Sequence, residues 1–202
     1  MIQALPELLS FEEFLDWYPE NGIYELHKGV VVEFELPGKH QEIAGFLQAE
    51  LYLEIRRLQR PDLTPLRCTI HPPNTQSAYK PDLAIVDRIG LKKESLWQPR
   101  STISNGETVT LLVEVASTNW RNDYLMKLKD YEEMRIQEYW IVDYLGLAAT
   151  RYLGSPKLPT LSIYSLVNGE YQVSQFRGEE TIASPTFPEL QLTAVQIFNA
   201  AN

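Results

Sequence analysis

The segment from residue 107 to residue 116 constrains the fold more strongly than any other part of the chain. Val109, Leu111, Val113 and Val115 share one face of a strand here, and Leu112 and Ala116 stand on the other, so both faces are expected to be buried. A helix is expected next, over residues 123–134, and then another strand over residues 138–144. Strand, helix and strand in this order favour a crossover between two parallel strands. The sequence therefore predicts an α/β fold whose sheet is covered on both faces.

Periodicity elsewhere predicts helices and strands around this unit. Ser10 and Glu13 have the spacing of a capping box, and Lys28 with Gly29 marks a hairpin turn. The expected elements are a helix from residue 11 to Pro19, strands over 24–27 and 30–34, a helix over 39–58, strands ending near 70 and over 79–86, an elaborated loop over 88–106 and a β meander after 151. Because no repeat or long linker interrupts it, we expect residues 1–202 to form one domain, with an N-terminal helix and hairpin over 1–36 and a β extension over 151–202.

Composition limits the class of protein. Hydrophobic residues make up 44% of the 202 residues, which is ample for a core and argues against disorder. No apolar run approaches the roughly 20 residues of a membrane helix, and the first residues do not have the pattern of a signal peptide. The single cysteine, Cys68, is expected to be a small buried side chain in a reducing, cytoplasmic location.

The charge of the chain is acidic overall but uneven. A net charge of −9 argues against a protein that coats nucleic acid non-specifically. Residues 1–60 carry 11 acidic and 5 basic side chains, whereas residues 61–110 carry 5 and 6. The slightly basic middle could face phosphate, or it could be a solvated helix end and loop. A local basic cleft is compatible with the acidic total.

Two carboxylates interrupt the apolar strands. Glu114 lies inside the doubly buried strand, where an unpaired carboxylate is costly, and Asp82 follows Pro81 at the head of another apolar run. The simple alternatives are an ion pair for Glu114 and strand-end turn chemistry for Asp82. On adjacent strands, however, the two side chains supply the hard oxygen ligands that Mg²⁺ takes. Such an ion polarises a phosphodiester and lowers the pKa of an attacking water.

The helix after Glu114 carries Asp123, Lys127 and Tyr131 at positions i, i+4 and i+8, so the three side chains form one stripe. Spacing alone favours a surface ion pair between Asp123 and Lys127, worth about 0.3–0.5 kcal/mol, over a catalytic lysine. Tyr131 is most simply a core residue.

Several motifs together resemble a nuclease superfamily. They are Tyr79-Lys80-Pro81-Asp82, Leu112-Val113-Glu114-Val115-Ala116-Ser117, the run from Asp123 to Lys127 with Tyr131, and Glu138-Tyr139-Trp140-Ile141-Val142-Asp143. This array resembles the PD-(D/E)XK nuclease superfamily, and within it the Uma-two family of restriction-endonuclease-like proteins. The likeness extends over most of the chain. It implies a restriction-endonuclease-like core, with a central mixed β-sheet flanked by helices, and a C-terminal β meander.

The resemblance also implies a site and a cofactor. It places metal ligands at Asp82 and Glu114 and implies Mg²⁺, with Mn²⁺ as a substitute. Position 116, where the superfamily's lysine would share the strand face of Glu114, holds alanine. Family members of this type carry the lysine on the following helix, where Lys127 matches better than Lys129. The implied catalytic set is therefore Asp82, Glu114 and Lys127.

An accessory set is less sharply defined and comprises His40, Glu42, Asp123 and Tyr131. Some superfamily members add an acid from the long N-terminal helix. Glu42 lies roughly 160° from the centre of that helix's apolar stripe, which speaks against a metal ligand. His40 falls close to the stripe and is as consistent with a core histidine as with a site residue. His27 and His71 have no partner that the sequence identifies.

Two functions follow from this reading. The first is a Mg²⁺-dependent endonuclease that hydrolyses DNA phosphodiester bonds, expected as a homodimer because a two-fold pair cuts both strands of a duplex. The second is a non-catalytic restriction-endonuclease-like module for binding or interaction, which the alanine at position 116 and the acidic charge favour. No phosphate loop, nucleophile elbow or zinc-ligand spacing supports a small-molecule enzyme.

Overall fold

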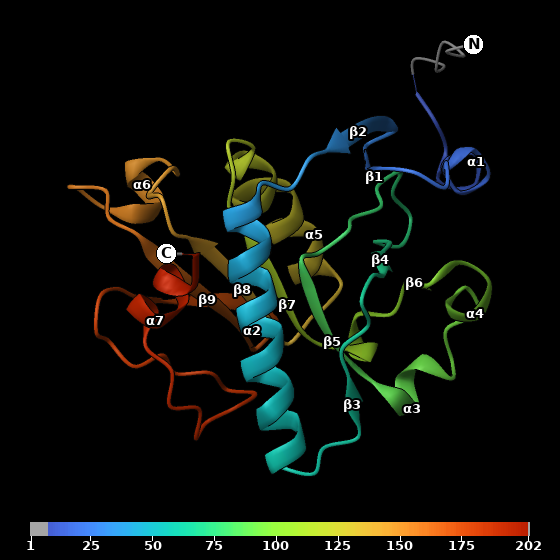
Figure 1. Cartoon of the computed structure of the whole chain (residues 1–202). Helices are drawn as coiled ribbons and strands as arrows, with labels where there is room; N and C mark the ends of the chain where they lie inside the picture. Colours follow the sequence, from blue (N-terminus) through green and yellow to red (C-terminus); the bar gives the residue numbers. More distant parts are fainter. Residues whose placement is uncertain (1–7, 202) are drawn as a thin grey trace.

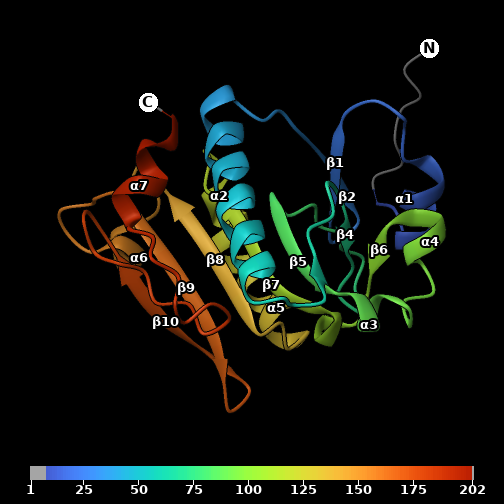
Figure 2. The same cartoon turned by 60° about the horizontal axis from the view of Figure 1, so that its bottom comes forward.

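A twisted six-stranded sheet forms the centre of the molecule (Figures 1 and 2). The computed structural model describes residues 8–201, so the expectation about a signal peptide at the start of the chain lies outside the described residues. In spatial order the strands are β10 (Glu170–Phe176), β9 (Thr160–Val167), β8 (Glu138–Asp143), β7 (Val109–Val115), β5 (Leu83–Asp87) and β3 (Asp62–Leu63). Within this sheet β7 and β8 are parallel and the other neighbours are antiparallel. The predicted parallel crossover and the mixed α/β class are confirmed.

Helices cover both faces of this sheet. In Figure 1, α2 (Gly38–Arg57) crosses the front face, and its fully buried Ile43 and Leu47 pack in one core cluster with β7. On the other face, Tyr131 of α5 (Leu128–Glu133) packs in a second cluster. Residues of β7 enter both clusters, so this strand is buried on both sides as its sequence predicts. None of the helices within residues 8–201 has the length and apolarity that a bilayer crossing requires.

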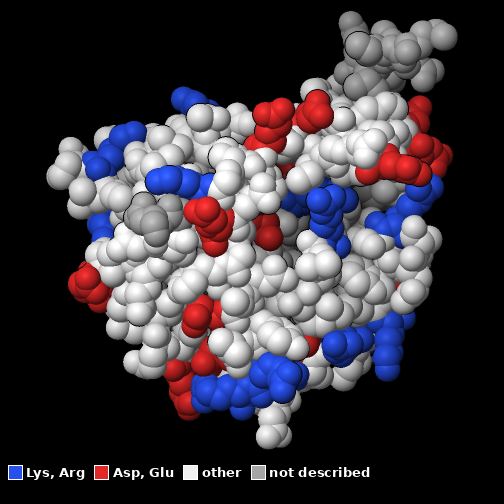
Figure 3. Space-filling model, viewed as in Figure 1, with Lys and Arg blue, Asp and Glu red and all other residues white. Residues whose placement is uncertain are grey.

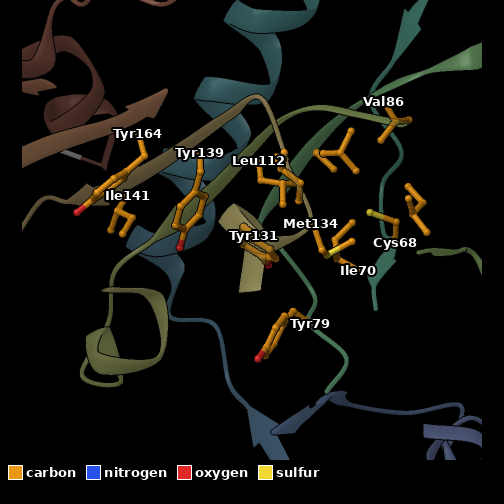
Figure 4. Packing of buried hydrophobic residues seen from close by; sticks show 14 of the residues in the cluster. Cys68, Ile70, Tyr79, Val86, Leu112, Tyr131, Met134, Tyr139, Ile141 and Tyr164 are labelled. Carbon is orange, nitrogen blue, oxygen red and sulfur yellow. The ribbon is translucent and has the colours of Figure 1, made fainter. Parts of the chain in front are cut away.

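Tyrosine rings form much of the second cluster. Tyr79, Tyr131, Tyr139 and Tyr164 follow one another with centroid separations of 5.8, 5.0 and 6.1 Å (Figure 4). The first two contacts are edge-to-face, an arrangement that the charge distribution of aromatic rings favours. Cys68 belongs to the same cluster, and burial raises the pKa of its thiol to about 12. The predicted buried cysteine is confirmed.

The N-terminal helix and hairpin form as predicted. The helix is α1 (Phe11–Trp17), which begins at a complete capping box. The hairpin pairs β1 (Ile23–His27) with β2 (Val30–Phe34). At its turn, Lys28 and Gly29 have φ angles of 51° and 89°. Both angles are positive, as the commonest two-residue hairpin turn requires.

The hairpin is fastened to the strand residues that precede β5. Leu26 and Ala78 exchange backbone hydrogen bonds of 2.9 and 2.8 Å. Nearby, β4 (Thr69–Ile70) bridges to Tyr79 and pairs in parallel with β6 (Thr102–Ile103). This small sheet and the hairpin therefore flank the point at which the chain enters β5. The strand expected over residues 79–86 begins later, at Leu83.

The segment over residues 88–106 is more ordered than the loop that the sequence predicts. It contains α3 (Arg88–Leu91), α4 (Trp97–Arg100) and β6, and it leads into the 3₁₀-helix η1 (Gly106–Thr108). The Glu94 carboxylate accepts hydrogen bonds of 2.9 to 3.0 Å from two backbone N–H groups and a threonine hydroxyl on the returning chain. These charge-assisted hydrogen bonds order the segment. They could not be predicted from apolar periodicity, because they involve polar groups.

The C-terminal extension continues the central sheet. After α6 (Thr150–Leu153), β9 and β10 form a hairpin, so that β8, β9 and β10 are an antiparallel meander at one edge. Within residues 177–201 the named elements are α7 (Ala194–Phe198) and the 3₁₀-helix η3 (Asn199–Ala201). Phe187, Leu190 and Leu192 of this tail join the cluster under α2. The meander that the sequence predicts is thus part of the main sheet, and the tail packs on its α2 side.

Candidate active site

A cavity of about 600 Å³ opens where the ends of β5 and β7 meet the hairpin and the first turns of α2. In Figure 3 a hollow lies near the centre of this face, with acidic side chains in and above it and basic side chains beside it. The charged and imidazole side chains that line the cavity are Glu25, Glu33, Glu35, His40, Arg67, Lys80, Asp82, Glu114, Asp123 and Lys127. The fold therefore brings all three of the implied catalytic residues into one cavity, together with two of the accessory set.

Asp82 and Glu114 face each other across neighbouring strands. Leu83 pairs with Val113 in the antiparallel ladder of β5 and β7, so Asp82 falls opposite Glu114. Asp82 Oδ2 accepts a hydrogen bond of 2.7 Å from the N–H of Val115, which holds the carboxylate at the end of the ladder. Directly opposed residues in such a ladder have Cβ atoms about 4.5–5.5 Å apart. Two carboxylates at this separation can bind one ion between them.

The first turn of α2 supplies a partner for Asp82. His40 is buried, and its Nε2 lies 2.7 Å from Asp82 Oδ1. Of the two interpretations that the sequence leaves open for His40, the contact with Asp82 favours a place in the site. Glu42, two residues further along the same helix, is exposed and does not line the cavity.

Lys127 is buried among three carboxylates. Its Nζ lies 3.0 Å from Glu114 Oε1, 3.1 Å from Glu25 Oε1 and 3.4 Å from Asp123 Oδ1. The side chain is 4% exposed, so the surface ion pair expected from the spacing of Asp123 and Lys127 is wrong, and the pair is buried. Lys129 is 70% exposed and pairs with Glu133 outside the cavity.

The segment that carries Asp123 and Lys127 is a π-helix. The α-helix expected over residues 123–134 begins instead as η2 (Asn122–Lys127), a π-helix, and becomes α-helical in α5. Hydrogen bonds between residues five apart widen the turn, and π segments occur frequently at functional sites. Asp123 and Lys127 are both buried in this wide turn. The spacing of Asp123, Lys127 and Tyr131 predicts their shared face but not the π turn.

Glu25 of β1 is a site residue that the sequence reasoning missed. Its Oε1 accepts a hydrogen bond of 2.7 Å from the N–H of Lys80 and also lies 3.1 Å from Lys127 Nζ. Its Oε2 lies 2.7 Å from Nε2 of His27, and the Glu25 side chain is 2% exposed. The sequence did contain one signal. Glu25 and His27 are two residues apart on a strand, so an acidic side chain and an imidazole project from the same face. The contact with Lys127 joins distant parts of the chain and has no local signature.

Negative charge exceeds positive charge in the cavity. Burial raises the pKa of Glu114 well above its usual value, and the carboxylates of Asp123 and Asp82 add to the rise, whereas Lys127 opposes it. Burial likewise raises the pKa of Asp123 to about 7. Burial also acts to raise the pKa of Glu25, but Lys127 and the hydrogen bonds described above hold it below its usual value. Of the three carboxylates around Lys127, Glu25 is therefore the one that stays ionised most firmly.

The same carboxylates keep Lys127 charged. Burial alone would lower the pKa of its ammonium, but Glu114, Glu25 and Asp123 together raise it well above the usual value. The hydroxyl of Tyr131 donates a hydrogen bond of 3.2 Å to Glu114 Oε1 from the tyrosine cluster below. At neutral pH Lys127 is thus a cation and a hydrogen-bond donor rather than a base.

The donor set suits a hard divalent cation. Mg²⁺ binds through one or two carboxylates and keeps several waters. Asp82 and Glu114 offer two carboxylates. Burial, and after it the charges of Asp123 and Asp82, raise the pKa of Glu114, and a divalent ion would offset that negative charge. Among residues 8–201, no group of three or more His, Cys, Asp or Glu side chains is placed to hold a metal ion. Asp82 and Glu114 would therefore hold an ion whose remaining ligands are water and substrate.

The fold and the cavity together define the class of protein. A mixed sheet flanked by helices, with opposed carboxylates at the strand ends and a lysine from the helix after β7, is typical of a restriction-endonuclease-like fold. The chain belongs to the Uma2 family, described as "Putative restriction endonuclease", whose family model matches residues 11–195. The resemblance seen in the sequence is confirmed.

A solved structure supports the same assignment. It is the crystal structure of "a putative nuclease belonging to DUF820" from Anabaena variabilis ATCC 29413. The two structures agree with a TM-score of 0.71 over 96% of this chain and 99% of that one, at 16% sequence identity. At this identity the likeness shows a shared fold. Among curated proteins, no match to the chain was found.

Proposed function

We propose that this protein is a Mg²⁺-dependent endonuclease that hydrolyses DNA phosphodiester bonds. The observation that carries the proposal is one cavity in which Asp82 falls opposite Glu114 and Lys127 Nζ lies 3.0 Å from Glu114 Oε1. Membership of a family described as restriction endonucleases supports nucleic acid as the substrate. The resemblance to Mg²⁺-dependent nucleases supports the metal.

Each side chain of the cavity has a part in the proposed reaction. A bound Mg²⁺ would act as a Lewis acid on the phosphate and lower the pKa of a coordinated water. Asp82 and Glu114 would hold the ion, and His40 would orient Asp82. Lys127 would donate hydrogen bonds to the attacking water or to the phosphate oxygens, where negative charge develops. In the overall reaction the oxygen of water bonds to phosphorus, one ester P–O bond breaks, and the leaving oxygen takes up a proton.

Plasmid cleavage tests this proposal. We expect the wild-type protein to nick and linearise supercoiled DNA in Mg²⁺ and to stop when EDTA is added. Removing Glu114 (Glu114→Gln) or Lys127 (Lys127→Met) should each reduce the rate by about 100-fold or more, the scale of losing one preorganised electrostatic group. Lys129→Met is the matched control, because its ammonium lies outside the cavity. A Glu114→Gln, Lys127→Met double variant that cleaves at the wild-type rate contradicts the proposal.

A second candidate function is a non-catalytic binding module. Ala116 stands where a strand lysine would reach a metal-bound water, and Lys127 is engaged by three carboxylates instead. Calorimetric titration with Mg²⁺ and Mn²⁺ separates the two candidates. Binding that disappears in Asp82→Asn supports the nuclease, and no binding at millimolar metal supports the module.

The homodimer belongs to the proposal as well. Cutting both strands of a duplex is most simply done by a two-fold pair of subunits. Sedimentation of the protein alone and with a DNA duplex tests it. Twice the mass of one chain is the expected result, and a single chain bound per duplex contradicts the dimer.

A further inference from the structure

Two cations line the cavity without an acidic partner. Lys80 and Arg67 both belong to the lining, and neither forms an ion pair with any carboxylate among residues 8–201. They differ in this from Lys127, whose ammonium is engaged on three sides. The Lys80 ammonium lies within electrostatic reach of Arg67 and of Glu25, and Glu25 forms no ion pair with it. Two like charges held near each other and open to a cavity favour the binding of an anion between them.

The backbone brings Lys80 next to the segment that carries Arg67. Ile70 and Tyr79 form an antiparallel bridge with N–H···O distances of 2.9 and 2.8 Å. One residue beyond the bridge, Thr69 therefore falls opposite Lys80, and Lys80 Nζ donates a hydrogen bond of 2.7 Å to Thr69 Oγ1. Arg67 lies two residues before Thr69, in a bend of the chain, and its exposed side chain lines the same cavity as Lys80.

The Lys80 ammonium is fixed before any ligand arrives. Besides the Thr69 hydroxyl, it lies 4.7 Å from the centroid of the Tyr18 ring, in a cation–π contact. Its side chain is half-buried, so much of its conformational freedom is already lost. Binding a ligand to such a group costs less ordering entropy than binding to a free surface lysine.

Lys80 is close in the chain to Asp82, one of the candidate metal ligands. Lys80 and Asp82 are two residues apart in the chain, so their Cα atoms are at most about 7 Å apart. This is the scale of the separation between successive phosphates of one nucleic-acid strand. Glu33 and Glu35 also line the cavity and would repel a strand, so we expect a strand to approach along Lys80 and Arg67.

We propose that Lys80 and Arg67 form a subsite for the phosphate next to the one at Asp82 and Glu114. The ligand is a phosphodiester group of a DNA strand, and the subsite sets the direction in which the strand crosses the cavity. This inference rests on the proposed function, because the position of the reacting phosphate comes from it.

The salt dependence of DNA binding tests the subsite. Affinity for a short fluorescent duplex is measured by anisotropy in Ca²⁺ over a series of KCl concentrations. Each lost phosphate contact reduces the slope of log K against log salt by about 0.9. We expect a reduction of this size in Lys80→Gln and in Arg67→Gln, with weaker binding to every sequence tested. Lys93→Gln is the matched control, because Lys93 is exposed and does not line the cavity.

Conservative variants and a parallel cleavage assay keep the outcomes separate. Lys80→Arg should retain the wild-type slope, and if Lys80→Gln fails to fold, Arg67→Gln carries the test. A slope in Lys80→Gln and Arg67→Gln equal to that of Lys93→Gln overturns the subsite, as does a wild-type protein that does not bind the duplex. Reduced slopes without cleavage in Mg²⁺ support the subsite and contradict the proposed catalysis. Cleavage with unchanged slopes does the reverse.

Discussion

Glu25 and Glu114 hold the Lys127 ammonium from two sides, one from the hairpin and the other from the central sheet. A metal ion that draws Glu114 toward itself would weaken one of these contacts. Glu25 would then keep the ammonium in place, because its low pKa leaves it ionised. At the residue scale, Glu25 is thus a positioning residue for the proposed reaction.

Replacing Glu25 with glutamine tests this positioning. The amide has no charge with which to hold Lys127, so we expect the cleavage rate at saturating DNA to fall by about 100-fold, the scale expected for a misplaced reacting group. The KM should change little, because Glu25 is buried and Lys127 stays in the cavity. Glu33→Gln is the control, since Glu33 lines the same cavity, but its carboxylate accepts a hydrogen bond from the Tyr24 hydroxyl and forms no ion pair with Lys127. Equal rates for the two variants contradict the role of Glu25.

Asp123 makes stability depend on pH. Its pKa of about 7 lies above the ordinary 3.8, so between these pH values the folded state holds the proton more tightly than the unfolded state does. Stability without metal therefore falls as the pH rises from about 4 to 7. In EDTA, Asp123→Asn should be more stable than the wild type at pH 8, by on the order of 1–3 kcal/mol, and nearly equal to it at pH 4. Urea unfolding at the two pH values measures this, and an equal difference at both contradicts it.

A site residue could be predicted from the sequence when a local pattern marked it, and could not when its contacts join distant parts of the chain. Glu114 stood out because the apolar alternation around it indicates burial on both faces. Asp82 stood out because it begins an apolar run, and the likeness to known nucleases joined it to Glu114 and Lys127. Glu25 was not foreseen, because its decisive contact joins the hairpin to a helix far along the chain. His40 was left open for the same reason, since its partner is on another element.

At the scale of elements, the π-helix η2 and the hairpin carry the least predictable parts of the site. The strands β7 and β8 and the helix α2 follow from their periodicity, and the structure confirms them within a few residues. A π-helix has the same local composition as an α-helix, so the sequence gives no warning of it. The ordering of residues 88–106 depends on Glu94 and is equally hidden.

Deleting Leu125 tests the role of the π-helix. Leu125 is 43% exposed within η2, so its loss removes little buried surface. One residue fewer should return the segment to α-helical geometry and move Lys127 away from Glu114. We expect melting close to that of Leu125→Ala but cleavage reduced by about 100-fold. A folded deletion variant that cleaves like Leu125→Ala would show that the π turn does not matter.

At the scale of the whole molecule, the excess of acid has a local explanation. The chain carries a net charge of −9, and the cavity holds several carboxylates around one fully buried cation. Basic side chains lie beside the hollow in Figure 3 rather than throughout it. A protein of this kind is suited to bind nucleic acid at one place and with a metal, and poorly suited to coat it.

Metal binding should therefore stabilise the whole fold. An ion that binds the folded state and not the unfolded state raises the melting temperature with its concentration. We expect Mg²⁺ to raise the melting temperature of the wild type but not of Asp82→Asn or Glu114→Gln. Glu42→Gln should respond like the wild type, because Glu42 is exposed outside the cavity. Differential scanning fluorimetry measures the shift, and an equal shift in Asp82→Asn contradicts the assigned ligands.

Four of the cavity's side chains come from four elements that are far apart in the chain: the hairpin, the residue before β5, the end of β7 and the π-helix. No contiguous stretch of sequence contains Glu25, Asp82, Glu114 and Lys127 together. A chain that is still emerging from the ribosome, or that has lost its hairpin, has an incomplete set of reacting groups. If the protein cuts DNA as proposed, its topology is also a safeguard, because the ability to cut arises only when folding is complete.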